Sequence, residues 1–185
     1  MAPALKKNTL WTALAAAAAF AFLVAMVISG ALPEQRQLVK FEAKGVMKLE
    51  PDRISRVELH QSERKAVLLR TPDGGWATQG GNAMSAEMAK KLSLAVQFMN
   101  TAGPIRVMQP EELAGTNPRD FGLDQPRLTI TLFANAQPVL GARFGAHNPE
   151  DMAQYMMLDG RQDVILMSRF VGQEWESVAG GVFAK

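Results

Sequence analysis

The chain has 185 residues and a formal net charge of +2 at neutral pH. So small a charge argues against nucleic acid as a partner, because binding to phosphates needs a strongly basic surface. The chain has no cysteine, which excludes disulfide bonds, thiol catalysis and a lipid anchor attached through cysteine.

The first long segment, residues 10–32, carries no charged side chain. About 23 residues of helix reach roughly 34 Å, enough to span the ~30 Å hydrocarbon core of a bilayer. We therefore predict a transmembrane signal anchor at residues 10–32, preceded by a short cytoplasmic tail at residues 1–9. The alternative is a cleaved signal peptide, with Lys6 and Lys7 as its basic start and small residues at 29–31, although the apolar segment is longer than usual.

Basic residues flank both ends of this segment. Two precede it and four follow it, namely Lys6, Lys7, Arg36, Lys40, Lys44 and Lys48. This count alone does not favour a cytoplasmic amino terminus, but large domains cross a membrane largely regardless of charge. Because a short tail before a long uncharged segment is typical of a signal anchor, we expect the following domain outside the cytoplasm.

Residues 33–51 read as a charged juxtamembrane linker. Lys40, Lys44 and Lys48 recur at helical spacing, so one interpretation is a short amphipathic helix on the membrane surface. The other is a solvated stalk that leads into the first strand of the domain.

The first half of the domain begins with a hairpin at residues 53–70, where apolar and polar residues alternate around a polar turn. A helix is predicted over residues 85–102 with Ser85 as its N-cap. One face of this helix is apolar and comprises Met88, Leu92, Ala95, Val96 and Met99. A short strand follows at residues 105–109.

The second half is mostly strand. Alternation predicts a strand at residues 128–133, and shorter strands are expected at 138–146, 154–159 and 164–168. A final amphipathic helix is predicted over 169–180. The two halves share an order of hairpins and one helix, without a repeat at the level of residues. Residues 52–185 are therefore expected to form one α+β domain, a mostly antiparallel sheet packed with one or two helices.

The stretch Asp120-Phe121-Gly122 matches the magnesium-binding triplet of protein kinases, but the other kinase motifs are missing from the sequence. A structural turn explains the same residues. Gly122 accepts positive φ, Asp124 can hydrogen-bond to the backbone ahead of it, and Pro126 favours an extended chain before the next strand.

The segment FGLDQPRLTITL, followed by LGARFG and by Tyr155 ahead of DVILM, resembles a bacterial family known as domain of unknown function four-three-four-zero. The order ISRVEL, VLLRTPDGGWAT, helix and IRVM is similar as well. The resemblance covers about residues 53–168, and its most specific parts are the Gly-Leu-Asp-x-Pro turn and the Gly-Gly-Trp corner. It implies an anchor in the bacterial inner membrane, an α+β domain on the periplasmic side and, for some members, association with ABC-type export systems. It implies no catalytic residues.

Candidate chemistry is sparse. His60 lies on a predicted strand among solvent-facing residues, whereas His147 lies in a loop with Glu150 and Asp151, a set that could in principle hold a metal ion. The acidic pair Glu111 and Glu112 is expected to be solvated, and the spacing of Gly141 and Gly145 lacks the lysine and hydroxyl residue of a phosphate loop. We predict no catalytic, cofactor-binding or metal-binding residues and no cofactor.

Methionine is abundant, with 11 residues in the chain. Met152, Met156 and Met157 are close together. Methionine fills irregular cores and adaptable surfaces, so packing in the core is the favoured interpretation, a partner surface is the second and binding of Cu(I) is the third. Where the domain contacts a partner, we expect the contact at sheet-edge strands or through these three methionines.

These observations favour a membrane-anchored, non-enzymatic accessory or assembly subunit of an envelope complex. Its partners are expected to be the lipid bilayer, through residues 10–32, and other proteins of a membrane complex, such as an ABC-type exporter. The alternative is an extracytoplasmic enzyme or small-ligand-binding domain whose site the sequence does not reveal.

Overall fold

The computed structural model describes residues 5–28 and 44–184, which belong to two separate compact units, Met1–Glu42 and Ala43–Lys185. In the first unit, α1 (Leu5–Ile28) begins within the stretch predicted as the tail. Among the described residues, no helix meets the combined length and hydropathy required of a membrane span. Residues 29–32 of the predicted span, residues 1–4 and residues 33–43 of the linker lie outside the described part of the chain.

The second unit begins earlier than the predicted boundary at residue 52. Met47 is buried, and its N–H donates to the carbonyl of Met99 at 2.8 Å. Gly45 lies so close to the backbone of Asn100 that any side chain there would collide with it. Residues 44–50 form no helix, so the surface-helix interpretation is wrong for Lys44 and Lys48, whereas Lys40 lies outside the described residues.

All strands of the described domain belong to one sheet, and every pair of neighbours is antiparallel. The strands are β1 (Arg56–Gln61), β2 (Arg64–Arg70), β3 (Trp76–Thr78), β4 (Arg106–Met108), β5 (Leu128–Ala134), β6 (Gln137–His147), β7 (Ala153–Leu158) and β8 (Val164–Ser168). Their order across the sheet is β3-β2-β1-β5-β6-β7-β8-β4. The predicted α+β class with a mostly antiparallel sheet is confirmed, as is the hairpin that β1 and β2 form.

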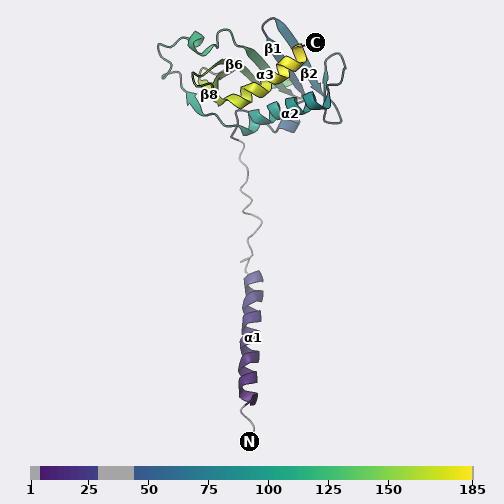
Figure 1. Cartoon of the computed structure of the whole chain (residues 1–185), viewed down its shortest axis with the longest axis vertical. Coiled ribbons are helices and arrows are strands. Elements are labelled where there is room, and N and C mark those ends of the chain that lie inside the picture. The colour runs from purple at the N-terminus through teal and green to yellow at the C-terminus, as the bar shows by residue number, and fades with distance from the viewer. Residues whose placement is uncertain (1–4, 29–43, 185) are drawn as a thin grey trace. The chain divides into compact units, whose positions relative to one another are not determined.

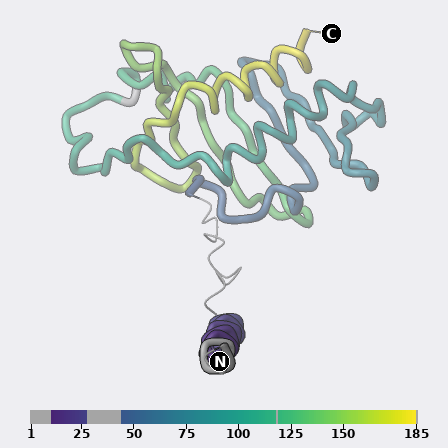
Figure 2. The backbone as a smooth tube through the Cα atoms, turned by 60° about the horizontal axis from the view of Figure 1, so that its bottom comes forward, coloured from purple at the N-terminus to yellow at the C-terminus, as the bar shows by residue number. Residues whose placement is uncertain are grey.

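Two helices, α2 (Ala86–Thr101) and α3 (Arg169–Phe183), cover one face of the sheet side by side (Figures 1 and 2). Ser85 caps α2 as predicted, because its side chain accepts a hydrogen bond from the N–H of Met88. The core between helices and sheet includes fully buried side chains from each layer, among them Leu92, Met99, Ile130, Phe144 and Trp175. The amphipathic patterns therefore correctly predict the buried side of both helices, except that Phe170, expected on the apolar face of the last helix with Val171, Trp175 and Val178, is 47% exposed.

The opposite face of the sheet differs between its two ends. Over β1, β2 and β5 it is polar: Lys65 and Arg56 both pair with Glu58, and Arg56 also stacks over the ring of Phe133 at 3.6 Å. Toward β7 and β8 the chain segment that contains the short 3-10 helix η3 (Pro118–Phe121) packs on the sheet, with Phe121 edge-on to Tyr155.

The residues after η3 form a turn, as the sequence predicted. Gly122 has φ of +65°, and a side chain on it would press against the backbone of Ala146 on β6. Asp124 differs from expectation, because its carboxylate accepts a hydrogen bond from the side chain of Arg119 at 3.1 Å. Pro126 precedes β5 by two positions, where its missing N–H leaves the ladder intact.

Candidate functional site

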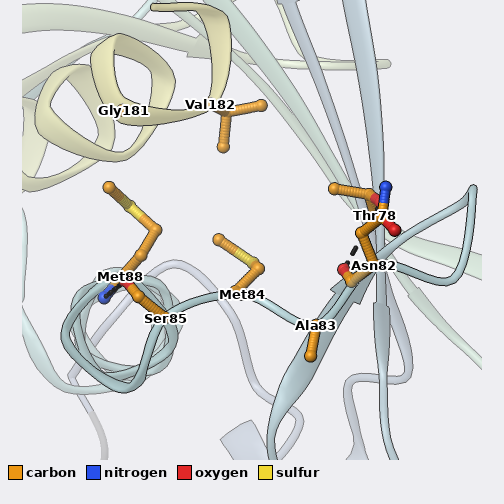
Figure 3. Close-up of a pocket in the computed structure, with 8 residues that line it drawn as sticks. All are labelled: Thr78, Asn82, Ala83, Met84, Ser85, Met88, Gly181 and Val182. Carbon is orange, nitrogen blue, oxygen red and sulfur yellow. Dashed lines mark hydrogen bonds between the residues drawn. The ribbon is translucent and has the colours of Figure 1, made fainter. Parts of the chain in front are cut away.

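An apolar groove opens between the start of α2, the end of α3 and the chain segment that returns from β3. Eight residues line it: Thr78, Asn82, Ala83, Met84, Ser85, Met88, Gly181 and Val182. The cavity volume is about 180 Å³. In Figure 3 the side chains of Met84 and Met88 extend into the space beneath the end of α3 that carries Gly181 and Val182. We refer to this feature as the methionine groove.

One wall of the methionine groove is an edge of the sheet. Residues 82–84 run antiparallel to β3, with Ala83 opposite Ala77. The hydrogen bonds that join the two segments are made by the residues on either side of Ala83, from Thr78 N–H to the Asn82 carbonyl and from Met84 N–H to the Trp76 carbonyl. In an antiparallel ladder this pattern turns the N–H and C=O of Ala83 away from β3. Among residues 44–184, none forms a hydrogen bond with them.

The residues that line the groove are suited to binding an apolar side chain. Met84 and Met88 are half-buried, and their thioether side chains can adjust to different shapes. Gly181 leaves room on the helix, since a Cβ there would occupy the place of the Met88 terminal methyl group. The groove can therefore accept an apolar side chain, while the outward backbone groups of Ala83 offer one donor and one acceptor.

A second cluster joins the β6–β7 turn to α3. His147 Nδ1 lies 3.0 Å from Asp151, and its Nε2 lies 3.6 Å from Glu176. Arg169 contacts both carboxylates at 3.4 Å. The fully buried amide of Gln154 donates to Glu176 at 3.2 Å and to the carbonyl of Gly145 at 3.1 Å. We refer to these five side chains, His147, Asp151, Gln154, Arg169 and Glu176, as the His147 cluster.

The His147 cluster is best explained as a structural cross-link. Arg169 balances two carboxylates, so opposite charges face one another within the cluster. The amide of Gln154 fills the space above Gly172, where a side chain would collide with it. The two contacts from α3 to Gln154 and His147 fix the first turns of that helix on the sheet. Among the described residues, no group of three or more histidine and carboxylate side chains is arranged to hold a metal ion.

Comparisons of the chain with models of known families, with curated proteins and with solved structures found no match. The resemblance to a family of unknown function therefore rests on the sequence motifs, and it stays a prediction.

The three methionines predicted as a partner surface do not lie together. Met152 is 72% exposed, whereas Met156 is fully buried in the core between sheet and helices. Met157 lies on the other face of the sheet, where its sulfur accepts a hydrogen bond from Arg143 at 3.1 Å. The partner-surface interpretation is therefore wrong for Met156, which packs in the core as the favoured interpretation had it. Neighbours on a strand point to opposite faces, which separates Met156 from Met157.

Other predicted residues are dispersed. His60 is exposed, as expected of a solvent-facing strand residue. The structure brings His147 and Asp151 together, but the carboxylate of Glu150 instead accepts a hydrogen bond from Asn148 at 2.6 Å. Sequence reasoning missed Arg169 and Glu176. Their spacing places both on one side of a helix, but nothing local indicates that this side meets His147.

The remaining motif residues have structural explanations. Glu111 is exposed, and Glu112 binds Arg106 at 2.6 Å. Gly141 makes room for the side chain of Asp159, and Gly145 for the carbonyl of Phe121. Sequence reasoning did not identify the methionine groove. The abundance of methionine was a signal, but the sequence singled out Met152, Met156 and Met157, none of which lines the groove.

Proposed function

We propose that the protein is a membrane-anchored, non-enzymatic accessory or assembly subunit whose domain binds another protein of an envelope membrane complex. The observation that carries this proposal is the contrast between the two units of the chain. The first offers an apolar helix with exposed side chains, and the second is a compact domain with an apolar groove beside an open sheet edge.

The anchor part of the proposal rests on α1. Large apolar side chains are exposed all round this helix, for example Trp11 at 69% and Phe20 at 71%, together with Phe22, Leu23 and Val27. A helix that is apolar on every side needs an apolar environment. Residues 10–32 carry no charge, so a bilayer is the environment that suits the sequence best.

The binding part of the proposal rests on the domain. An anchor confines the domain near the membrane surface, which raises its effective concentration toward partners in the same membrane. The methionine groove combines adaptable apolar side chains with unpaired backbone groups, two features that favour contact with another polypeptide. The resemblance of the sequence to a family of which some members accompany ABC-type export systems supports the same kind of partner.

Membrane anchoring is tested by cell fractionation of a variant with a charge in α1. In Leu23→Arg, the arginine would cost about 2.5–3.5 kcal/mol at the centre of a bilayer-spanning helix, so we expect a large share of the protein to leave the membrane fraction. The matched control Leu23→Ile should remain in the membrane. Equal membrane retention of both variants would count against the anchor. A carboxyl-terminal reporter that is active only in the cytoplasm should be silent, and its activity would reverse the proposed orientation.

Partner binding is tested by purification of the full chain in a mild detergent, followed by mass spectrometry. We expect one or a few membrane proteins to copurify reproducibly and in fixed stoichiometry. A control fusion that carries residues 1–43 on an unrelated soluble domain should lose them, because the proposal assigns binding to residues 44–184. A protein that purifies as a monomer without partners would contradict the proposal.

A further inference from the structure

The domain contains an internal structural repeat. The half from β1 to α2 and the half from β5 to α3 both consist of a hairpin, a third strand, a returning segment and a helix. In both halves the residues Met-Ser precede the helix, as Met84-Ser85 before α2 and Met167-Ser168 before α3. The halves meet where β1 pairs with β5 in antiparallel fashion, with Glu58 opposite Thr131. Outward from this central pair, each half continues with its hairpin partner and then its third strand: β2 and β3 on one side, β6 and β7 on the other.

The repeat assigns counterparts to the residues of the methionine groove. Residues 82–84 return along β3 as β8 returns along β7, so Ala83 corresponds to Leu166. Ala83 lies opposite Ala77 of β3, and Leu166 lies opposite Tyr155 of β7. Both halves therefore present the same backbone arrangement just before their helices.

The outer side of this arrangement is occupied in one half only. β4 pairs with β8, and the N–H of Ile105 donates to the outward carbonyl of Leu166 at 2.8 Å. Val107 on β4 is partly buried against the core. No strand among residues 44–184 lies along the outer side of Ala83, the counterpart position.

The two halves also differ in how side chains occupy the space between the returning segment and the helices. Phe98 of α2 is partly buried against the core and stacks edge-on against Phe170 at the start of α3, the helix that follows β8, with ring centroids 5.0 Å apart. Phe98 and Gly181 hold the same position relative to the serine that immediately precedes their helices, so α3 has a hydrogen atom where α2 has a ring. The methionine groove is the space that remains there (Figure 3).

We propose that residues 82–84 and the methionine groove bind an extended segment of a partner protein as an additional antiparallel strand. This inference rests on the proposed function and names the surface by which the partner is held. β4 shows what kind of segment fits: a short strand whose backbone bonds to the returning segment and whose alternate side chains are apolar. One such side chain enters between Met84, Met88 and Val182, while the strand bonds to the N–H and C=O of Ala83. This mode of recognition takes affinity from backbone bonds and selectivity from the pocket.

The polar face over β1, β2 and β5 fits such a partner less well. Its charged groups already have partners, since Glu58 binds both Lys65 and Arg56. A partner there would have to displace these ion pairs, whereas nothing in the described chain has to leave the outer side of Ala83.

A peptide with the sequence of β4 and its neighbours, GPIRVMQ from residues 103–109, is a defined probe for the site. The full chain in detergent is labelled with ¹³C at the methionine methyl groups and titrated with this peptide. We expect saturable shifts of the Met84 and Met88 signals at submillimolar to millimolar peptide, with Met152 and Met156 unchanged. Absence of any shift at Met84 and Met88 overturns the proposal. Shifts confined to Met108 and Met167 also overturn it, because they show exchange with β4 at the opposite edge.

Two adjacent glycines of α3 supply a matched pair of variants. Gly181→Leu places a side chain in the groove, whereas nothing lies within 4 Å of a Cβ at Gly180, so Gly180→Leu leaves the groove open. Both changes exchange glycine for a better helix former. We expect Gly181→Leu to weaken peptide binding at least tenfold and Gly180→Leu to leave it within twofold, with both proteins folded by circular dichroism. Equal affinities overturn the proposal.

The same pair separates this inference from the proposed function. If the membrane partner copurifies with Gly180→Leu and is lost from Gly181→Leu, the groove is the contact. If it copurifies equally with both variants, the adaptor function stands and the groove proposal fails. If no partner copurifies even with the unaltered chain, the proposed function fails, and with it the inference that depends on it.

Discussion

Asn100, on the last turn of α2, holds Met47, which lies 53 positions earlier in the sequence. Its side-chain Nδ2 donates to the carbonyl of Met47 at 3.1 Å and to that of Leu49 at 3.2 Å, and the side chain is almost fully buried. The backbone carbonyl of Asn100 in turn accepts the N–H of Gly45 at 2.7 Å. These bonds attach the entry segment, residues 44–50, to the domain.

Asn100→Leu should therefore loosen the entry segment. The substitution removes the side-chain hydrogen bonds to the carbonyls of Met47 and Leu49, and we expect the free energy of unfolding to fall by about 1–3 kcal/mol. Urea denaturation measures this loss, and hydrogen exchange at the N–H of Met47 should accelerate. Gln97→Leu is the control, because Gln97 is exposed on the same helix and its replacement should change stability by less than about 0.5 kcal/mol. Equal effects of the two substitutions would contradict this role of Asn100.

Leu92→Asp should strongly destabilise the domain. Leu92 is fully buried in the middle of the apolar face of α2, so the aspartate would lose the apolar contacts and place an unpaired carboxylate in the core. We expect a loss of more than about 3 kcal/mol, seen as a much lower melting temperature or as failure to fold. Lys90→Asp, at an exposed position of the same helix, should leave the fold intact. An unchanged melting temperature for Leu92→Asp would show that this face is not the core.

Gly172→Ala should destabilise α3 at its contact with the sheet. The new methyl group would collide with the buried amide of Gln154, which also holds Glu176 in the His147 cluster. We expect a cost of about 1–3 kcal/mol from overpacking. Gly180→Ala meets no neighbour and should stabilise the same helix by about 0.5–1 kcal/mol. Chemical denaturation of the two variants should therefore give opposite signs, and a gain in stability for Gly172→Ala would argue against a rigid Gln154.

The ion pair between Arg106 and Glu112 predicts a pH dependence. The hydrogen bond from Arg106 lowers the pKa of Glu112 below its usual value of 4.5, and the hydrogen bond from the N–H of Gln109 lowers it further by a smaller amount. A carboxylate whose pKa is lower in the folded state adds stability above its unfolded pKa, and this contribution disappears as pH falls through the folded pKa. The stabilising contribution is thus fully present at neutral pH and is lost only in acid, below pH 4.5.

Titration of the Glu112 carboxyl carbon by NMR measures this effect. We expect a midpoint below 4.5 in the unaltered chain and a higher midpoint in Arg106→Gln, which removes the charged donor. Arg127→Gln is a control that removes one arginine elsewhere and should leave the midpoint of Glu112 unchanged. An equal midpoint with and without Arg106 would refute the assigned cause.

The sequence predicted most elements of the domain because their signals are local. Alternation at residues 57–60 and 128–133 and the helical spacing from Met88 to Met99 correspond to elements that the structure contains. Ser85 acts as the N-cap because a serine ahead of an apolar helix can bond to the free N–H groups of the first turn. The start of the domain was placed too late, since the irregular segment around Met47 has no periodic pattern.

The candidate sites were less predictable than the elements. Period-two alternation places Met156 and Met157 on opposite faces of a strand, but it does not say which face the helices cover. The His147 cluster depends on where α3 crosses the end of β6, a relation between residues far apart in the chain. Neither arrangement has a local signature.

By itself, the sequence determined the α+β class, the uncharged segment at residues 10–32 and the apolar faces of both helices, because each depends on the order of neighbouring residues. Only the tertiary structure decided that β4 joins β8 and leaves the outer side of Ala83 without a strand. Strand partners are chosen by contacts between distant segments, and the two Met-Ser helix starts look alike in sequence whether or not a strand lies beside them. The methionine groove exists because the fold places β4 beside β8, at one edge of the sheet, and places Gly181 near residues 82–84, at the other edge.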